Sequence, residues 1–346
     1  FFLLYDKMAL FDSMLASATI WTVYLAYDYP LFSGIALGLA FLSKPTAILF
    51  IPVILMIGVF QKKIKWAVFA VVIGELINNL LRLSHVYYLM DAKNQQFQQP
   101  LSKLLADPFA LFLGNLHSLL SWDISYLTVP IFILGVVSLV FLLYKNWRQG
   151  IVFLACWLGP ILVFAIVGLE IFPRYILFTT PFLLIPIGFF LNKCRYLILI
   201  LPLLMIPVFK FDYALLTNPI NAAMPDTDYH QYVSEHPSGY GLQPVFRFLH
   251  AEVKTGPVVL ITQGTFGLYP YAFTLEFWGD KNLIIVPRWP LSSIDKEMQA
   301  LKSQGKVYVL LKEFAKPPTD WPMTTVLISP KPPGGEKYPL ILSELK

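Results

Sequence analysis

Carboxylates and a lysine stand at the ends of the first two apolar stretches of this 346-residue chain. Asp6 and Asp12 precede the first stretch, and Lys44 follows the second. Ionisable groups at the mouth of a membrane hairpin are costly and usually serve a function. Asp12 could hold a divalent cation, Mg²⁺ or Mn²⁺, and either acid could hold a substrate hydroxyl. Both could equally cap a helix N-terminus, where the helix dipole favours negative charge.

Three cations follow a related pattern, because Lys44, Arg82 and Arg174 each lie beside an apolar run. Cations that converge on one face could bind a phosphate or pyrophosphate group. Side chains that only reach the membrane interface would give the same spacing. The phosphate site is favoured because the predicted topology puts all three cations outside, whereas basic residues normally gather on the inner side.

The composition indicates a membrane protein. Hydrophobic residues make up 57% of the chain and charged residues 14%, against about 25% charged in a typical soluble domain. The net charge of +5 arises from basic loops between apolar runs, so it reports membrane topology and no nucleic-acid partner is expected. Cys156 and Cys194 belong to no CxxC pair and predict neither a disulfide nor a metal site.

About eight apolar runs approach the roughly 20 residues that a membrane helix needs. They lie at residues 11–27, 31–43, 46–60, 66–82, 125–144, 150–168, 175–191 and 196–209. Three purely basic loops, 62–65, 145–148 and 193–195, are separated by even numbers of runs, so all three can face the cytoplasm. That orientation puts six charged residues outside: Asp6, Asp12, Lys44, Arg82, Glu170 and Arg174.

Two further regions are expected on the outer face. Residues 83–122 form an outer loop, in which 107–121 predict an amphipathic helix along the membrane interface. Beyond residue 210, strand patterns near 258–262, 283–286, 307–311, 324–328 and 340–342 alternate with helical patterns near 243–253, 265–277 and 294–303. This alternation predicts a small α/β domain with a largely parallel sheet. The expected fold class is a mainly α polytopic membrane protein (residues 1–209) with a C-terminal extracytoplasmic α/β domain (residues 210–346).

Other polar residues favour structural roles. Glu75, Asn78 and Asn79 are expected first to bond one another and only second to line a substrate path. The five histidines share no metal-binding spacing, and the turn at 263–267 lacks the lysine of a phosphate-binding loop. Glu170 precedes Arg174 by four residues and could pair with it. No nucleophile motif appears after residue 210.

Three segments resemble membrane glycosyltransferases of the C-type superfamily, in particular family 39, which includes protein O-mannosyltransferases and bacterial lipid A aminoarabinose transferases. Residues 6–15 (Asp-Lys-Met-Ala-Leu-Phe-Asp-Ser-Met-Leu) resemble its R-x-A-L-x-D-x-x-L segment. Residues 33–44 (Ser-Gly-Ile-Ala-Leu-Gly-Leu-Ala-Phe-Leu-Ser-Lys) are similar to its G-x-x-x-G-L-A-x-L-T-K segment, and residues 172–181 to the start of a family helix. The resemblance covers about residues 1–209, and the tail resembles the extracytoplasmic domain of some bacterial members.

The resemblance implies an enzyme of the cell (inner or plasma) membrane that takes a sugar from a polyprenyl-phosphate-linked donor. The sugar would be transferred with inversion to a lipid, glycan or protein acceptor on the outer face. By position, Asp12 and Asp6 would be catalytic, with Asp12 the candidate metal ligand, and Lys44, Arg174 and Arg82 would bind the donor phosphate. Four residues would line the substrate cavity: Lys7, where the family usually has Arg, and Glu170, Tyr175 and His85.

One departure from the family pattern stands out. The family's first outer loop, whose Asp-Glu pair contains the proposed general base, precedes the segments found here, so an N-terminally truncated chain without that base is expected. A membrane transporter would explain Glu75, Asn78 and Asn79, although no internal repeat is visible. A non-catalytic glycan-binding membrane protein is the second alternative.

Overall fold

The computed structural model describes the whole chain except residues 1, 8–10, 86, 88–96 and 266, and except the side chains of residues 2, 6 and 7. The chain divides into two compact units, Phe1–Pro225 and Asp226–Lys346. The first unit continues past the expected residue 209 and includes α13 (Ile206–Thr217). On that helix, the Phe211 ring packs against Tyr126 with centroids 6.0 Å apart.

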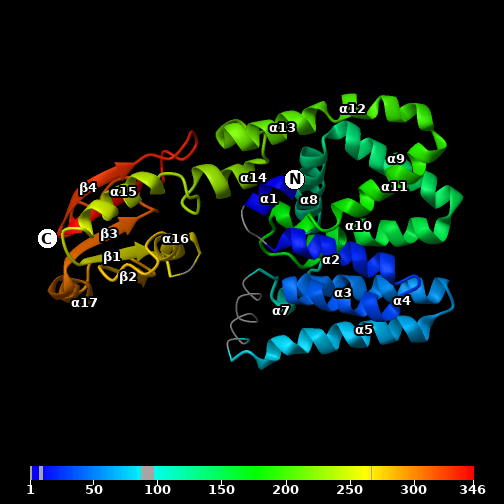
Figure 1. Ribbon diagram of the computed structural model, residues 1–346, viewed down its shortest axis with the longest axis horizontal. Helices are drawn as coiled ribbons and strands as arrows, with labels where there is room; N and C mark the ends of the chain where they lie inside the picture. Colours follow the sequence, from blue (N-terminus) through cyan, green and yellow to red (C-terminus); the bar gives the residue numbers. More distant parts are fainter. Residues whose placement is uncertain (1, 8–10, 86, 88–96, 266) are drawn as a thin grey trace. The chain divides into compact units, whose positions relative to one another are not determined.

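The first unit is built from helices (Figure 1). Its elements before α13 are α1 (Phe2–Lys7), α2 (Asp12–Leu25), α3 (Pro30–Ser43), η1 (Pro45–Phe50), α4 (Ile51–Phe60), α5 (Ile64–Asn78), η2 (Asn79–Leu83), α7 (Leu101–Ala106), α8 (Phe112–Leu127), α9 (Val129–Lys145), α10 (Trp147–Val167), η3 (Pro173–Ile176), α11 (Thr180–Lys193), η4 (Arg195–Leu199) and α12 (Leu201–Leu204). Of the helix predicted at 107–121, residues 112–121 are helical, within α8, and residues 107–111 are not. The chain turns sharply after α8 at Thr128, which has a φ of 67°.

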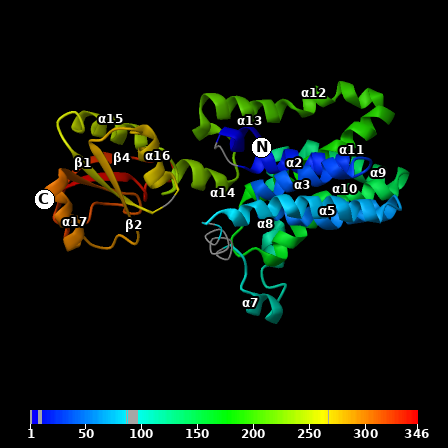
Figure 2. The ribbon, with the colours of Figure 1, turned by 60° about the horizontal axis from the view of Figure 1, so that its bottom comes forward.

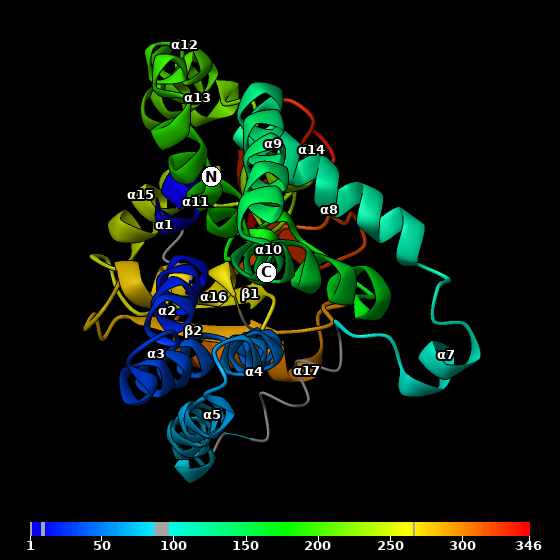
Figure 3. The same ribbon diagram turned by 90° about the vertical axis from the view of Figure 1, so that its right-hand side faces the viewer.

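Small residues allow α3 to pack closely between α2 and α5, and Figure 3 shows these three helices stacked. A Cβ atom added to Gly34 would lie 2.6 Å from the carbonyl oxygen of Ala70, and one added to Gly38 would lie 2.6 Å from the Ile77 Cβ. This Gly-x-x-x-Gly spacing lets two helix backbones approach each other. On the other side of α3, the buried Ser33 hydroxyl donates to the Thr22 carbonyl of α2 at 2.9 Å.

The expected number of about eight spans is too high for the described residues. By length and composition, two helices can cross a membrane, Ile64–Leu83 and Trp147–Val167, and the α8–α9 pair could supply a third crossing, although it bends by 108°. The shorter apolar helices are Pro30–Ser43, Pro45–Phe60 and Thr180–Lys193. A 14-residue helix is only about 21 Å long, whereas the hydrocarbon core is roughly 30 Å thick. Prolines in the first turn separate these helices from the segments before them.

The second unit has one five-stranded sheet with the order β2-β1-β3-β5-β4. Its elements are α14 (Asp226–Tyr229), η6 (His230–Ser234), α15 (Leu242–Glu252), β1 (Val258–Gln263), α16 (Leu268–Glu276), β2 (Leu283–Arg288), α17 (Lys296–Ala300), η7 (Leu301–Gln304), β3 (Lys306–Leu311), β4 (Met323–Ser329) and β5 (Leu340–Leu345). All five expected strands are present, and so are the three expected helices. Only β2, β1 and β3 are parallel, because β5 runs antiparallel between β3 and β4.

Alternating apolar residues of β1 serve both faces of this sheet. Val258 and Leu260 join the apolar cluster that contains α15 and α16 residues. Val259 and Ile261 join the opposite cluster, which contains Met298 of α17. Figure 2 shows α15 and α17 on opposite sides of the strands. The helices therefore cover both faces, as in a doubly wound sheet.

Candidate active site

The α2–α3 hairpin brings Asp12 and Lys44 to the same end of the helices. Asp12 is the first residue of α2, and Lys44 directly follows the last residue of α3. A short turn at residues 26–29 joins the helices, so the start of α2 lies beside the end of α3. The helix dipoles favour both charges, because an acid then lies at an N-terminus and a base at a C-terminus.

Asp12 and Lys44 form a largely buried ion pair. The Nζ of Lys44 donates to Oδ1 of Asp12 at 2.5 Å, and the two side chains are 25% and 2% exposed. The second carboxylate oxygen, Oδ2, is buried without a hydrogen-bond partner among the described residues. A buried acceptor without a donor is unfavourable by about 1–3 kcal/mol, so a hydroxyl that donates to Oδ2 would be favoured.

Arg174 and Tyr175 reach the same place from η3, which precedes α11. The Lys44 Nζ lies 5.7 Å from the centroid of the Tyr175 ring, and the Arg174 Cζ lies 5.7 Å from the same centroid. Arg174 also lies over the Phe172 ring, with its Cζ 4.7 Å from the centroid. Tyr175 thus has two cations at its ring, Lys44 from the turn after α3 and Arg174 from η3.

The charges at this site influence one another. Lys44 lies in the turn between α3 and η1, outside both helices. Burial lowers the pKa of the Lys44 ammonium, the Asp12 carboxylate opposes that shift, and Arg174 adds to it. The site is therefore one in which an added anion near Lys44 and Arg174 would be favoured.

The other predicted site residues are less closely gathered. Glu170 is exposed, although its charge is close enough to affect the Tyr175 hydroxyl. Arg82 lies in η2 and His85 shortly after it, and both are exposed. Across the part of the chain that the structure describes, no hydrogen bond or ion pair joins Arg82 or His85 to Asp12 or Lys44. The side chains of Asp6 and Lys7 lie outside the described residues.

The described side chains do not supply a metal-ligand set around Asp12. No group of three or more His, Cys, Asp or Glu side chains gathers anywhere within these residues. One oxygen of Asp12 already accepts from the Lys44 ammonium, a positive neighbour that opposes binding of a divalent cation. A divalent cation at Asp12 stays a prediction from the resemblance, and no chemical step here depends on it.

A buried carboxyl that the sequence patterns do not single out is Asp123 of α8. Its Oδ2 accepts from the Trp157 indole at 2.9 Å, and its Oδ1 accepts from the Thr180 hydroxyl at 3.1 Å. These bonds connect α8, α10 and α11, so we assign Asp123 to positioning rather than to chemistry. The one sequence signal is that Asp123 is the single acid of α8.

The polar residues at the end of α5 bond one another, as expected. The amide of Asn78 donates to a Glu75 carboxylate oxygen at 3.1 Å. The Asn79 amide donates to the Glu75 carbonyl at 2.7 Å. This arrangement favours the structural role predicted first for these residues.

Searches against protein-family models, curated proteins and solved structures find no match to this chain. The chemistry of the site is therefore inferred from its own geometry. A buried carboxylate lies near two cations and a phenol at the ends of apolar helices, and one of its oxygens has no hydrogen-bond donor among the described residues. Such a set can bind an anionic group through the cations and a hydroxyl through the carboxylate.

Proposed function

We propose that this chain transfers a sugar from a polyprenyl-phosphate-linked donor to an acceptor at the outer face of the cell membrane, with inversion at the anomeric carbon. One observation carries the proposal. Lys44 and Arg174 flank the Tyr175 ring beside the buried Asp12 carboxylate, at the ends of apolar helices. A donor with a phosphate head and a lipid tail needs a cationic site that adjoins an apolar surface.

The charges suit such a donor. Lys44 and Arg174 supply two positive charges, and a polyprenyl-phosphate sugar is a phosphodiester with one negative charge. Transfer converts it into a phosphate monoester, which bears more negative charge. Lys44 and Arg174 are already in place before the reaction, so they would stabilise the charge that develops on the leaving group.

The surface of α5 and η2 supports a lipid environment. Four exposed apolar residues recur every fourth position along it: Val68, Val72, Leu76 and Leu80. Residues four apart lie on one face of a helix, so they form an apolar stripe. Stripes of this kind are typical of surfaces that contact lipid or another apolar partner.

In the proposed reaction, the acceptor hydroxyl attacks the anomeric carbon from the side opposite the phosphate. The bond between that carbon and the phosphate oxygen breaks, and its electron pair stays on the phosphate. The hydroxyl proton passes to a carboxylate, for which Asp12 is assigned because its Oδ2 has no partner among the described residues. When the acceptor is an ionised phosphate, no proton needs to move.

The test measures release of polyprenyl phosphate from a panel of polyprenyl-phosphate sugars by the full-length protein in membranes. Wild type should release it from at least one donor, and Asp12→Asn should lower turnover by about 100-fold or more, which is typical for loss of an acid–base group. Asp28→Asn is the matched control, because Asp28 lies in the turn at the other end of the same hairpin and its side chain is 71% exposed. Its turnover should stay at the wild-type level.

Two outcomes would contradict the proposal. The first is a folded wild-type protein that releases polyprenyl phosphate from no donor in the panel. The second is full activity in Asp12→Asn, which would remove Asp12 from the chemistry.

A further inference from the structure

The order of strands in the second unit creates a position where ligands commonly bind. β1 lies between β2 and β3 and is parallel to both. The chain leaves β1 towards α16, on the face that also carries α15, and leaves β3 towards Phe314 and Trp321, which pack on the opposite face. In doubly wound sheets, ligands bind outside the carboxyl ends of the strands where connections diverge to opposite faces.

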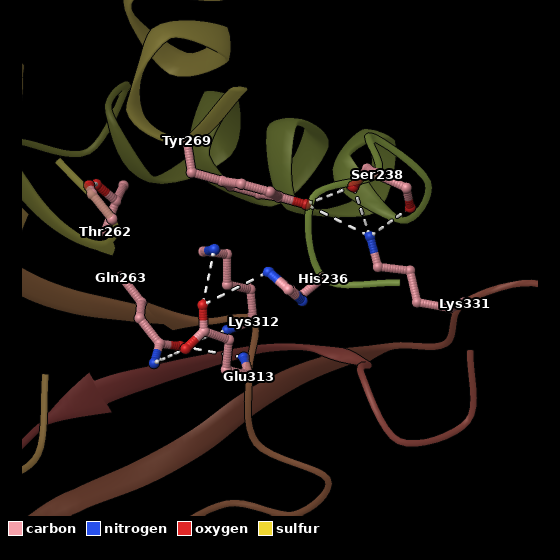
Figure 4. A network of polar contacts seen from close by, with 9 residues as sticks. His236, Ser238, Thr262, Gln263, Tyr269, Lys312, Glu313 and Lys331 are labelled. Carbon is pink, nitrogen blue, oxygen red and sulfur yellow. Dashed lines mark hydrogen bonds and ion pairs between the residues drawn. The ribbon is translucent and has the colours of Figure 1, made fainter. Parts of the chain in front are cut away.

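Polar residues occupy this edge of the sheet, as Figure 4 shows. Gln263 is the last residue of β1, and Lys312 and Glu313 directly follow β3. The side-chain oxygen of Gln263 accepts from the backbone N–H groups of Lys312 and Glu313, at 2.9 and 3.1 Å. Gln263 thereby fixes the two strand ends and holds the Lys312 and Glu313 side chains at the edge.

Lys312 is held between aromatic rings. Its Nζ donates to Glu313 Oε1 at 3.0 Å, and the same Nζ lies 5.9 Å from the ring centroids of both Tyr269 and Trp289. The Lys312 side chain is only 13% exposed, whereas Trp289 is 54% exposed. An accessible indole thus lies beside a positioned ammonium group.

Basic groups outweigh acidic ones here once His236 is protonated. His236 Nε2 lies 3.9 Å from Glu313 Oε1, and the His236 ring packs against Tyr338 with centroids 5.7 Å apart. The titration of His236 is influenced by Lys312, Lys331, Glu313 and Glu235. Lys331 is buried, and its Nζ donates to the Ser238 and Tyr240 carbonyls at 2.6 and 2.8 Å. Three bases against two acids leave one positive charge.

We infer that this edge of the second unit binds an anionic saccharide, a sugar that carries a carboxylate or a phosphate. The sugar ring lies on the Trp289 indole, which offers a flat apolar face. The anionic group binds at Lys312 and the protonated His236 through charge-assisted hydrogen bonds. All the residues involved belong to the second unit, so the inference does not depend on the proposed transferase activity.

The inference has a pH signature. Burial lowers the pKa of His236, Lys312 and Lys331 lower it further, and Glu313 and Glu235 oppose the shift. A bound anion favours the protonated imidazole and raises this pKa, so binding takes up a proton. Affinity should therefore increase as the pH falls through the pKa of the complex and level off below that of the free protein.

The test is isothermal titration of the full chain in detergent with glucuronate and glucose 1-phosphate, compared with methyl glucoside and inorganic phosphate. The anionic sugars should bind at least about tenfold more tightly than either comparison ligand, because methyl glucoside lacks the charged group and inorganic phosphate lacks the ring that lies on Trp289. Trp289→Ala and Lys312→Gln should each weaken binding by about tenfold. His236→Gln should abolish the dependence of glucuronate affinity on pH, because glucuronate stays ionised while the imidazole titrates.

Matched controls come from the amino ends of the strands, opposite the proposed site. Trp278, which is 80% exposed, precedes β2, and the exposed Lys302 precedes β3. Trp278→Ala and Lys302→Gln should leave affinity unchanged. Lys44→Met should also leave it unchanged, which separates this site from that of the first unit.

Several results would overturn the inference. They are the absence of saturable binding, equal affinity for inorganic phosphate or methyl glucoside, and unchanged affinity in Trp289→Ala and Lys312→Gln. Trp289 is exposed, so its alanine variant is expected to fold. A thermal unfolding curve like that of wild type verifies this before binding is measured.

Discussion

Asp12 and Lys44 lie 32 residues apart in the sequence, and their side chains meet at 2.5 Å at one end of a helical hairpin. The opposite end has a second acid–base pair, Asp28 and Lys63, at 3.4 Å. The two pairs differ in burial, since Asp12 is 2% exposed and Asp28 is 71% exposed. Exposed pairs contribute only about 0–1 kcal/mol to stability, whereas a buried pair that loses one partner is strongly destabilised. The hairpin thus has one buried and one exposed ion pair.

The two cations beside Tyr175 should act on donor binding. Lys44→Met and Arg174→Met should each raise the KM for the polyprenyl-phosphate donor by about tenfold or more, because each removes a charged contact of about 1.5–3 kcal/mol. Lys63→Met is the matched control and should leave KM unchanged. The measurement is steady-state kinetics over a range of donor concentrations, at a temperature where thermal unfolding shows both site variants to be folded. An unchanged KM in both site variants would show that the donor phosphate binds elsewhere.

Replacement of Gly34 should destabilise the packing of α3 on α5. Gly34→Ala places a Cβ 2.6 Å from the Ala70 carbonyl oxygen, and such overpacking typically destabilises by about 1–3 kcal/mol. The control is Gly188→Ala in α11, where an added Cβ meets nothing within 4 Å and alanine should stabilise by about 1 kcal/mol. Thermal unfolding in detergent should therefore shift in opposite directions for the two variants. A rise in the unfolding temperature of Gly34→Ala would contradict the close helix contact.

Asp123 should matter for stability more than for chemistry. Asp123→Ala leaves the buried Trp157 indole and Thr180 hydroxyl without their acceptor, which should destabilise the protein by about 2–5 kcal/mol. Asp28→Ala is the control, and an exposed acid of this kind should change stability by about 1 kcal/mol or less. The measurement is thermal unfolding, followed by kinetics at a temperature where both proteins are folded. A large loss of turnover in folded Asp123→Ala would assign Asp123 to the reaction instead.

Lys331 should make the stability of the second unit depend on pH. Burial lowers its pKa to about 8, and Lys312 adds to this shift. From about pH 8 up to the ordinary lysine value near 10.4, the unfolded chain binds more protons than the folded one, so stability should rise with pH. Below about pH 8 both states are protonated, and the Lys331 contribution should be constant.

Lys331→Met should remove that rise. It should also lower stability by a constant amount, because the Ser238 and Tyr240 carbonyls lose their donor. The readout is therefore the slope of the unfolding temperature against pH between 8 and about 10, not its absolute value. The exposed Lys302 provides the control, and Lys302→Met should retain the wild-type slope. Equal slopes in all three proteins would rule out titration of Lys331 as the cause.

The sequence by itself determined the local structure of this protein. Alternation and helical periodicity are properties of neighbouring residues, so they located all five strands and the three main helices of the second unit. The same locality explains why Asp12 and Lys44 could be placed at one end of a hairpin, since a short turn leaves two consecutive helices only an antiparallel arrangement.

The tertiary structure decided what depends on contacts between distant segments. Hydropathy did not reveal that prolines divide the apolar runs into helices too short to span a membrane alone. Asp123, Trp157 and Thr180 meet only because α8, α10 and α11 pack together. The Lys331 ammonium similarly depends on carbonyls more than 90 residues earlier in the chain. Such partners are chosen by packing and burial over the whole unit, and no pattern in a local window of sequence records them.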